Sequence, residues 1–194
     1  MFGTLALDNS DLIVLILICF FAGLIRGFSG FGLSAFVMSL ALTIIPPIEL
    51  IPVCWWMEFF ASVFMIKNGW KDSDKKISII LWLGAIFGLP IGIFLTTILD
   101  FQTSKIIALV LILILALILL KNFKIQFLST TAGTGFSGVC AGVATGLASI
   151  GGMIVATYVL ASQNSARRMR ASLVLYILLN SITTFIFLII FDVM

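Results

Sequence analysis

Two short glycine-rich segments hold most of the residues that can do chemistry. The first reads Arg-Gly-Phe-Ser-Gly-Phe-Gly over residues 26–32, and the second reads Thr-Gly-Leu-Ala-Ser-Ile-Gly-Gly over residues 145–152. Both lie inside long apolar stretches, where broken backbone must face protein or water because lipid cannot satisfy its amides. A helix that restarts at such a break presents unpaired N–H groups and a partial positive charge, which suit an anion. Both segments are therefore candidate anion sites.

Two charged residues inside apolar stretches add to these candidates. Arg26 is the only basic residue well inside such a stretch, where a charge is costly unless it is paired or hydrated. It is either an anion contact or gating charge, a structural partner of Glu58, or a side chain that snorkels to the interface. Glu58 lies mid-span between two pairs of aromatic residues. It either carries a coupling proton or serves as the static partner of Arg26.

The predicted substrate-binding residues line the two breaks with backbone N–H, hydroxyl, amide and guanidinium groups. They are Arg26, Ser29, Gly30, Gly32, Ser149, Gly151, Gly152 and Asn180. For the small residues the alternative is close helix packing, which needs no ligand, and for Asn180 it is an ordinary hydrogen bond between helices. Glycines at every fourth position, at residues 84, 88 and 92 and at residues 138, 142 and 146, favour tight helix contact over binding.

The composition defines the class of protein. Of 194 residues, 62% are hydrophobic and 10% are charged, against about half and about a quarter in soluble domains. Such a chain is an integral membrane protein, and no part of it is polar enough for a soluble catalytic or nucleic-acid-binding domain. Histidine is absent and no nucleophile is paired with a base, so we expect no enzyme, metal centre or cofactor. The predicted partners are a small anionic substrate and membrane lipids.

Four apolar runs have the length of ordinary membrane spans, about 20 residues each. They cover roughly residues 50–66, 77–99, 105–120 and 171–191. Two further stretches, residues 12–45 and 131–161, would be about 50 and 46 Å long as continuous helix, too long for one span and too short for two. Each is therefore predicted to be a hairpin that enters and returns on one side of the membrane.

The basic residues of the loops agree with this topology. They are Lys67, Lys71, Lys75, Lys76, Lys121, Lys124, Arg167, Arg168 and Arg170. With two hairpins and four spans all of them lie on the cytoplasmic side, as the positive-inside rule favours, whereas single crossings would separate them. Because three spans lie between the hairpins, the hairpins enter from opposite sides, and their breaks are expected to meet near the bilayer midplane.

The sequence therefore predicts an inverted repeat. With an offset of 119, Ala22, Gly23, Gly27, Gly32 and Ser62 fall on Ala141, Gly142, Gly146, Gly151 and Ser181. We divide it into residues 1–125, one hairpin and three spans, and residues 126–194, one hairpin and one span. The predicted fold is an all-α polytopic transmembrane helical bundle with inverted-topology repeats and two discontinuous or re-entrant hairpins. The second repeat is two spans short, and we expect a second copy or a partner subunit to complete it.

Several motifs, in order along the chain, resemble the TauE/SafE family of sulfite exporters. They are RGFSGFG at residues 26–32, the following Pro46-Pro47, Glu58, GxxxGxPxG at residues 84–92, and GLASIGG at residues 146–152 followed by ASQNSARRMRASL. The resemblance implies a multi-pass permease of the bacterial inner membrane that moves small sulfur-containing or carboxylated anions without ATP hydrolysis. Many relatives carry a proline soon after the second glycine cluster, and this chain has none there.

We therefore expect a secondary transporter that exports a small anion, sulfite or an organosulfonate, by alternating access. The alternative is a non-transporting accessory or assembly subunit of a membrane complex. In that case Arg26 and Glu58 face one another and no cavity connects to them. Import in place of export stays open, because gradients set the direction of a symmetric carrier.

Overall fold

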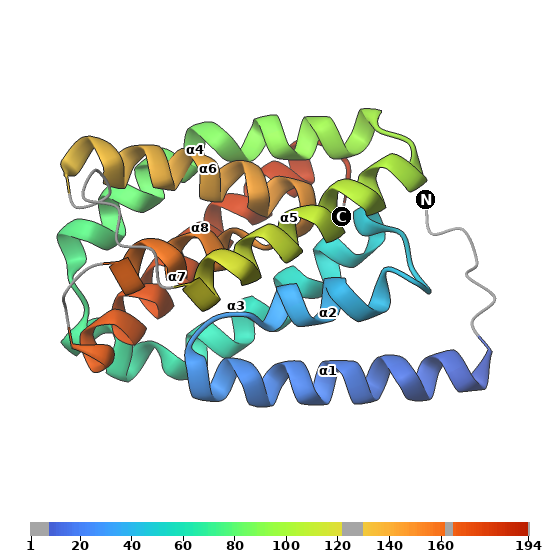
Figure 1. The fold of residues 1–194 in the computed structure, drawn as a ribbon, viewed down its shortest axis with the longest axis horizontal. Coiled ribbons are helices and arrows are strands. Elements are labelled where there is room, and N and C mark those ends of the chain that lie inside the picture. The colour runs from blue at the N-terminus through green and yellow to red at the C-terminus, as the bar shows by residue number, and fades with distance from the viewer. Residues whose placement is uncertain (1–7, 122–129, 162–164, 194) are drawn as a thin grey trace.

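The computed structural model describes residues 8–121, 130–161 and 165–193, and these residues are helical with short turns. The predicted all-α fold is confirmed (Figure 1). The helices of this part of the chain are α1 (Asn9–Ser29), α2 (Leu33–Ala41), α3 (Pro47–Asp72), α4 (Lys75–Ile98), α5 (Phe101–Lys121), α6 (Thr131–Ala148), α7 (Gly151–Ala161) and α8 (Ala166–Ile190).

Five of the described helices, α1, α3, α4, α5 and α8, are long and apolar enough to cross a membrane. Four of them correspond to the four predicted spans. The fifth, α1, is the first arm of the first predicted hairpin and has 21 residues. The returning helices α2 and α7 have 9 and 11 residues, too few to span. Each long stretch therefore consists of a longer helix followed by a short one.

Both helix breaks fall inside the glycine-rich segments, as predicted. Helix α1 ends at Ser29, and Gly30 and Gly32 have φ angles of 83° and 87°. This left-handed conformation is strained for residues with a side chain, so these two positions favour glycine. Helix α6 ends at Ala148, followed by Ser149, whose φ of 57° is also left-handed.

The helix boundaries follow the offset of 119 that relates the two glycine-rich segments. The left-handed residues Gly30 and Ser149 are separated by this number, and so are the starts of α3 at Pro47 and of α8 at Ala166. Helices α1 and α6 also end at positions that differ by 119. The division into two repeats at residues 125 and 126 remains a proposal, and these boundaries support it.

Helices α4 and α6 pack in parallel through their glycines. A Cβ atom on Gly88 would collide with the carbonyl of Val139, and one on Gly142 would lie 2.8 Å from the Cα atom of Ala85. Contacts progress in the same direction along both helices, because Gly84 lies against Gly138 and Gly92 lies against Gly146. The prediction that these glycines serve tight helix contact is confirmed.

One end of the bundle, which we call the basic end, gathers the end of α3 and the starts of α4 and α8. Arg167 Nε lies 2.7 Å from Asp72 Oδ2, and the N–H of Asp74 donates to Ser172 Oγ at 2.8 Å. Helix α1 also ends here, because the guanidinium of Arg170 donates to the carbonyl of Gly27. Lys124, one of the predicted cytoplasmic charges, lies outside the described residues.

The two hairpins enter from opposite ends of the bundle. Helix α1 ends at the basic end, whereas α6 starts there, since it runs parallel to α4. Figure 1 shows α1 along the edge of the bundle with α2 folded back beside it. This arrangement is the one that an inverted repeat requires.

Both breaks lie beside Glu58, near the middle of α3, and this supports the expectation that they meet near the bilayer midplane. The carboxylate of Glu58 accepts hydrogen bonds from Ser34 at the start of α2, and Glu58 lines the same small cavity as Ser149 of the second break. The first break contacts Arg170 and the second lies beside Asn180, about 15 Å further along α8.

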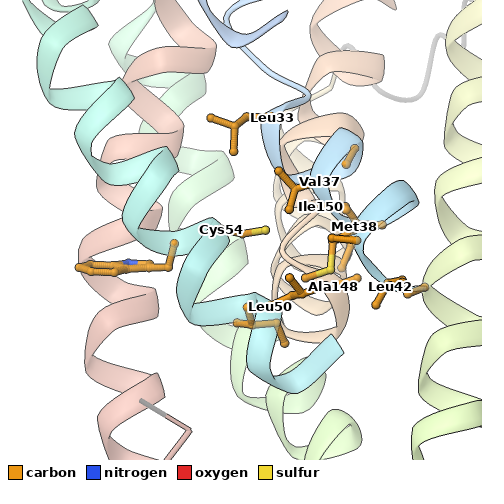
Figure 2. Close-up of a cluster of buried hydrophobic side chains, with 14 of the residues drawn as sticks. Leu33, Val37, Met38, Leu42, Leu50, Cys54, Ala148 and Ile150 are labelled. Carbon is orange, nitrogen blue, oxygen red and sulfur yellow. The ribbon is translucent and has the colours of Figure 1, made fainter. Parts of the chain in front are cut away.

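Helix α2 packs its apolar side chains against α3 and the second break (Figure 2). Val37 and Met38 lie in one buried cluster with Cys54 of α3 and with Ala148 and Ile150 on either side of the break. The second break is therefore covered by apolar residues of the first hairpin on one side. The polar residues of the second break face α3 and α8.

Candidate functional site

The first break lies next to a buried ion pair. Arg26, one helical turn before the break, is 1% exposed, and its Nε lies 2.9 Å from Oε2 of Glu58 on α3. Its Nη2 donates to Ser62 Oγ at 2.8 Å, one turn further along α3. A buried charge is tolerated when it is paired and hydrogen-bonded in this way. Of the alternatives drawn from the sequence, the structure shows the pairing with Glu58 and excludes snorkelling in this state.

The carboxylate of Glu58 also binds the start of the half-helix α2. Its Oε1 accepts a hydrogen bond from Ser34 Oγ at 3.0 Å and a longer one from the N–H of Ser34 at 3.4 Å. The first turn of a helix carries unpaired N–H groups and a partial positive charge. In the described structure, the place that this break offers to an anion is therefore occupied by an anion of the protein itself.

Three predicted site residues, Ser29, Gly30 and Gly32, form the turn of the first break. The hydroxyl of Ser29 donates to the carbonyl of Ile25 at 2.8 Å or to that of Phe31, and it accepts from the N–H of Phe31 at 3.2 Å. A Cβ atom on Gly30 would lie 2.7 Å from Cγ of Arg170. These residues hold Arg26 and α2 in position.

The second break borders a small polar cavity of about 30 Å³, which we call the chamber. Its walls come from α3, α6, α8 and the start of α7: Trp55, Glu58, Thr145, Ser149, Gly152, Tyr176, Ile177, Asn180, Ser181 and Thr184. Four predicted residues, Glu58, Ser149, Gly152 and Asn180, therefore meet in one place. Gly151 does not line the chamber, because its Cα atom faces the Ala141 carbonyl and the Thr145 hydroxyl on α6.

The polar groups of the chamber are neutral, apart from Glu58, and incompletely paired. Asn180 Nδ2 donates to Thr145 Oγ1 at 3.4 Å, and Thr145 Oγ1 donates to the carbonyl of Ala141 at 2.8 Å. Asn180 is buried, yet its Oδ1 has no hydrogen-bond partner among the described residues. Buried amides normally find partners, and a cavity of this size holds about one water molecule. The chamber is therefore suited to a small polar guest.

Trp55 forms a rigid wall of the chamber. Its Nε1 donates to the carbonyl of Ser181 at 2.7 Å, and its ring stacks between Phe59 and Phe185, with centroid distances of 5.3 and 4.9 Å. Stacked aromatic rings and a buried indole hydrogen bond fix the side chain in one orientation. Trp55 thus ties α3 to α8 at this level of the bundle.

Sequence reasoning missed several chamber residues, most clearly Thr145, Tyr176 and Thr184. One signal was present, since Thr145 falls on Arg26 in the offset of 119. A second was the spacing of Ile177, Asn180, Ser181 and Thr184, which places these residues on one face of a helix.

The comparison with protein families agrees with this architecture. The model described as Sulfite exporter TauE/SafE matches residues 15–194, nearly the whole chain. The chain belongs to the TauE/SafE family. No curated protein and no solved structure matches it. TauE/SafE proteins form a family of membrane transporters rather than enzymes, and five apolar helices of the described chain make this member a multi-pass membrane protein.

Proposed function

We propose that this TauE/SafE protein exports a small anion, sulfite or an organosulfonate, across the inner membrane by alternating access. The family supports transport of such anions. The inverted course of the two hairpins supports alternating access, which in other carriers occurs around a site between inverted repeats. The chamber lies between α3 and α8, the helices that correspond in the two halves, and one of its walls is Glu58, which pairs with Arg26 of α1.

The observation that carries this proposal is the position of Glu58. Its carboxylate rests on Arg26 and on the start of α2 while it also lines the chamber. The groups around it can therefore hold an oxyanion, and a small polar cavity lies beside them. A chamber of about 30 Å³ holds a water molecule but not an oxyanion, so this conformation is a closed one and the helices must separate during transport.

The accessory-subunit alternative predicts the same Arg26–Glu58 pair but no cavity next to it. The polar chamber that Glu58 lines favours the transporter. The amide oxygen of Asn180 is buried and has no hydrogen-bond partner among the described residues, which is unfavourable for stability. Helix packing alone does not require such a group.

Efflux of radiolabelled sulfite from proteoliposomes tests the proposal. Wild-type protein should release sulfite faster than protein-free vesicles, and Arg26→Gln should slow release by about 10- to 100-fold, the equivalent of one lost hydrogen bond to a charged group. Arg168→Gln is the matched control, because this exposed arginine lines neither cavity of the described chain. Wild-type release at the rate of empty vesicles, for sulfite and for an organosulfonate, would favour the accessory subunit.

A further inference from the structure

A second, larger cavity opens at the basic end of the bundle. It has a volume of about 650 Å³ and lies between the end of α1, the end of α3 and the start of α8. Its walls include Ser29 of α1, Met65, Gly69 and Asp72 of α3, and Arg167 and Arg170 of α8. We call this cavity the vestibule. It has ample room for a hydrated oxyanion.

The vestibule carries excess positive charge. Arg167 pairs with Asp72, yet its side chain is 80% exposed, and Arg170 binds only the backbone carbonyl of Gly27 among the described hydrogen bonds. Two guanidinium groups thus face one carboxylate, and the positive end of the α8 dipole lies beside them. Such a concave, positively charged surface attracts small anions.

The vestibule and the chamber lie along one seam between α3 and α8. On α8 the vestibule is lined by Arg167, Arg170, Ala171 and Val174, and the chamber by Ile177, Asn180, Ser181 and Thr184. Steps of three and four residues keep all of these on one helix face. On α3 the residues Trp55 and Glu58 of the chamber continue to Met65, Gly69 and Asp72 of the vestibule in the same way.

The ion pair lies on this seam between the two cavities. Arg26 precedes Ser29, a vestibule residue, by one turn of α1, and Ser62 precedes Met65, another vestibule residue, by one turn of α3. On the other side Glu58 faces the chamber. Arg26 has a further donor to offer, because its Nη1 is buried and has no hydrogen-bond partner in the described part of the chain.

We propose that the Arg26–Glu58 pair is a gate between the vestibule and the chamber, and that an oxyanion passes by replacing the carboxylate of Glu58 on Arg26. This inference rests on the proposed transport function. The arriving oxyanion binds the guanidinium of Arg26, and the carboxylate of Glu58 turns toward the chamber, which it already borders. Glu58 therefore competes with the substrate for Arg26, and this competition sets the affinity for the anion.

Sulfite binding to the purified protein, measured by calorimetry, separates this gate from a static ion pair. If Glu58 competes with sulfite, Glu58→Gln should lower the dissociation constant by about tenfold, because the competing state is removed. Glu58→Asp, which keeps the charge but shortens the side chain, should lower it by less. Glu49→Gln is the matched control on the same helix, away from both cavities, and should leave the constant unchanged.

The outcomes are distinguishable from failure of the proposed function. A wild-type protein that binds neither sulfite nor an organosulfonate overturns the proposed function itself. A wild-type protein that binds sulfite, together with a folded Glu58→Gln or Glu58→Asp variant that binds it equally or more weakly, overturns the gate alone. If neither single variant folds and the double variant Arg26→Gln/Glu58→Gln restores both folding and sulfite binding, the pair is static and the gate is likewise overturned.

Discussion

The two helix breaks share a left-handed residue at the same position, Gly30 and Ser149, but differ in their charged groups. At the first break, Arg26 pairs with Glu58, and the carboxylate binds the start of the following half-helix. The residues that fall on these two with an offset of 119 are Thr145 and Ile177, which carry no charge. Of Arg26, Glu58 and Ser62, which bond to one another at the first break, only the serine recurs at the second, as Ser181.

This difference shows that the start of a half-helix can be neutralised by a carboxylate of the protein at one break and be surrounded by neutral polar groups at the other. The first half-helix has its positive end neutralised by a side chain of the protein. The second starts beside Ser149, Gly152 and Asn180, where no carboxylate other than Glu58 is present among the chamber residues. A guest anion therefore finds neutral donors at one break and a competing carboxylate at the other.

The largest effect is expected when the charges of the first break are introduced at the corresponding positions of the second break. Thr145→Arg adds a buried cation at the second break, where Glu58 is already paired with Arg26, and should lower the free energy of unfolding by about 3–5 kcal/mol, as uncompensated buried charges do. Adding Ile177→Glu should recover most of this loss, since it supplies the partner that the first break has. Thermal and denaturant unfolding in detergent would measure both variants. A Thr145→Arg variant as stable as the wild type would mean that water already reaches the second break.

Substitutions of the two corresponding serines, Ser62 and Ser181, should have smaller effects on the free energy of unfolding. Ser62→Ala removes the acceptor of the Arg26 guanidinium and should cost about 1.5–3 kcal/mol, the range for hydrogen bonds to charged groups. Ser181→Ala removes a hydroxyl that donates to the Ile177 carbonyl of its own helix, and should cost less than about 1 kcal/mol. The same unfolding assays apply, and equal losses for the two variants would remove the electrostatic distinction between the breaks.

The left-handed residues Gly30 and Ser149 allow the backbone conformations of the two breaks to be compared. Gly30→Ala should destabilise the protein by about 1–2 kcal/mol, because a side chain is unfavourable at a φ of 83° and the added Cβ atom approaches Arg170. Ser149→Gly removes a side chain from the same conformation and should change stability by less than about 1 kcal/mol. A Gly30→Ala variant with wild-type stability would indicate that the first break relaxes freely.

Cysteine labelling tests the inverted course of the hairpins with almost no effect on stability, since surface substitutions change it by about 0.5 kcal/mol or less. In a background without the three native cysteines, Ser73→Cys and Ser165→Cys should react with an impermeant maleimide from the cytoplasm. Thr43→Cys, exposed in the turn between α2 and α3, should react only from the other side. Labelling of Ser73→Cys and Ser165→Cys from different sides would contradict the arrangement.

The sequence predicted the helices well because the membrane restricts the alternatives. An apolar run of about 20 residues has one stable form in lipid, and this rule located α3, α4, α5 and α8. The glycine-rich segments located both breaks, since left-handed backbone at Gly30 and Gly32 favours glycine. The lengths of the returning half-helices, 9 residues for α2 and 11 for α7, depend on packing and cannot be taken from composition.

The candidate site was predicted only in part. Arg26 and Glu58 stand out in a sequence because charges in apolar spans are rare. Thr145, Ser181 and Thr184 do not stand out, because hydroxyl side chains in membrane helices commonly bond to a carbonyl of their own helix, as all three do here. That they also surround a chamber depends on how α3, α6 and α8 pack.

Crystals of the wild-type protein grown with selenite, a sulfite analogue with an anomalously scattering atom, would show directly where the anion binds. We expect a selenium peak either in contact with Arg26, with Glu58 turned toward the chamber, or between Ser149 and Asn180 in a widened chamber. Selenium at neither place, with Glu58 still on Arg26 and the chamber unchanged, would contradict it.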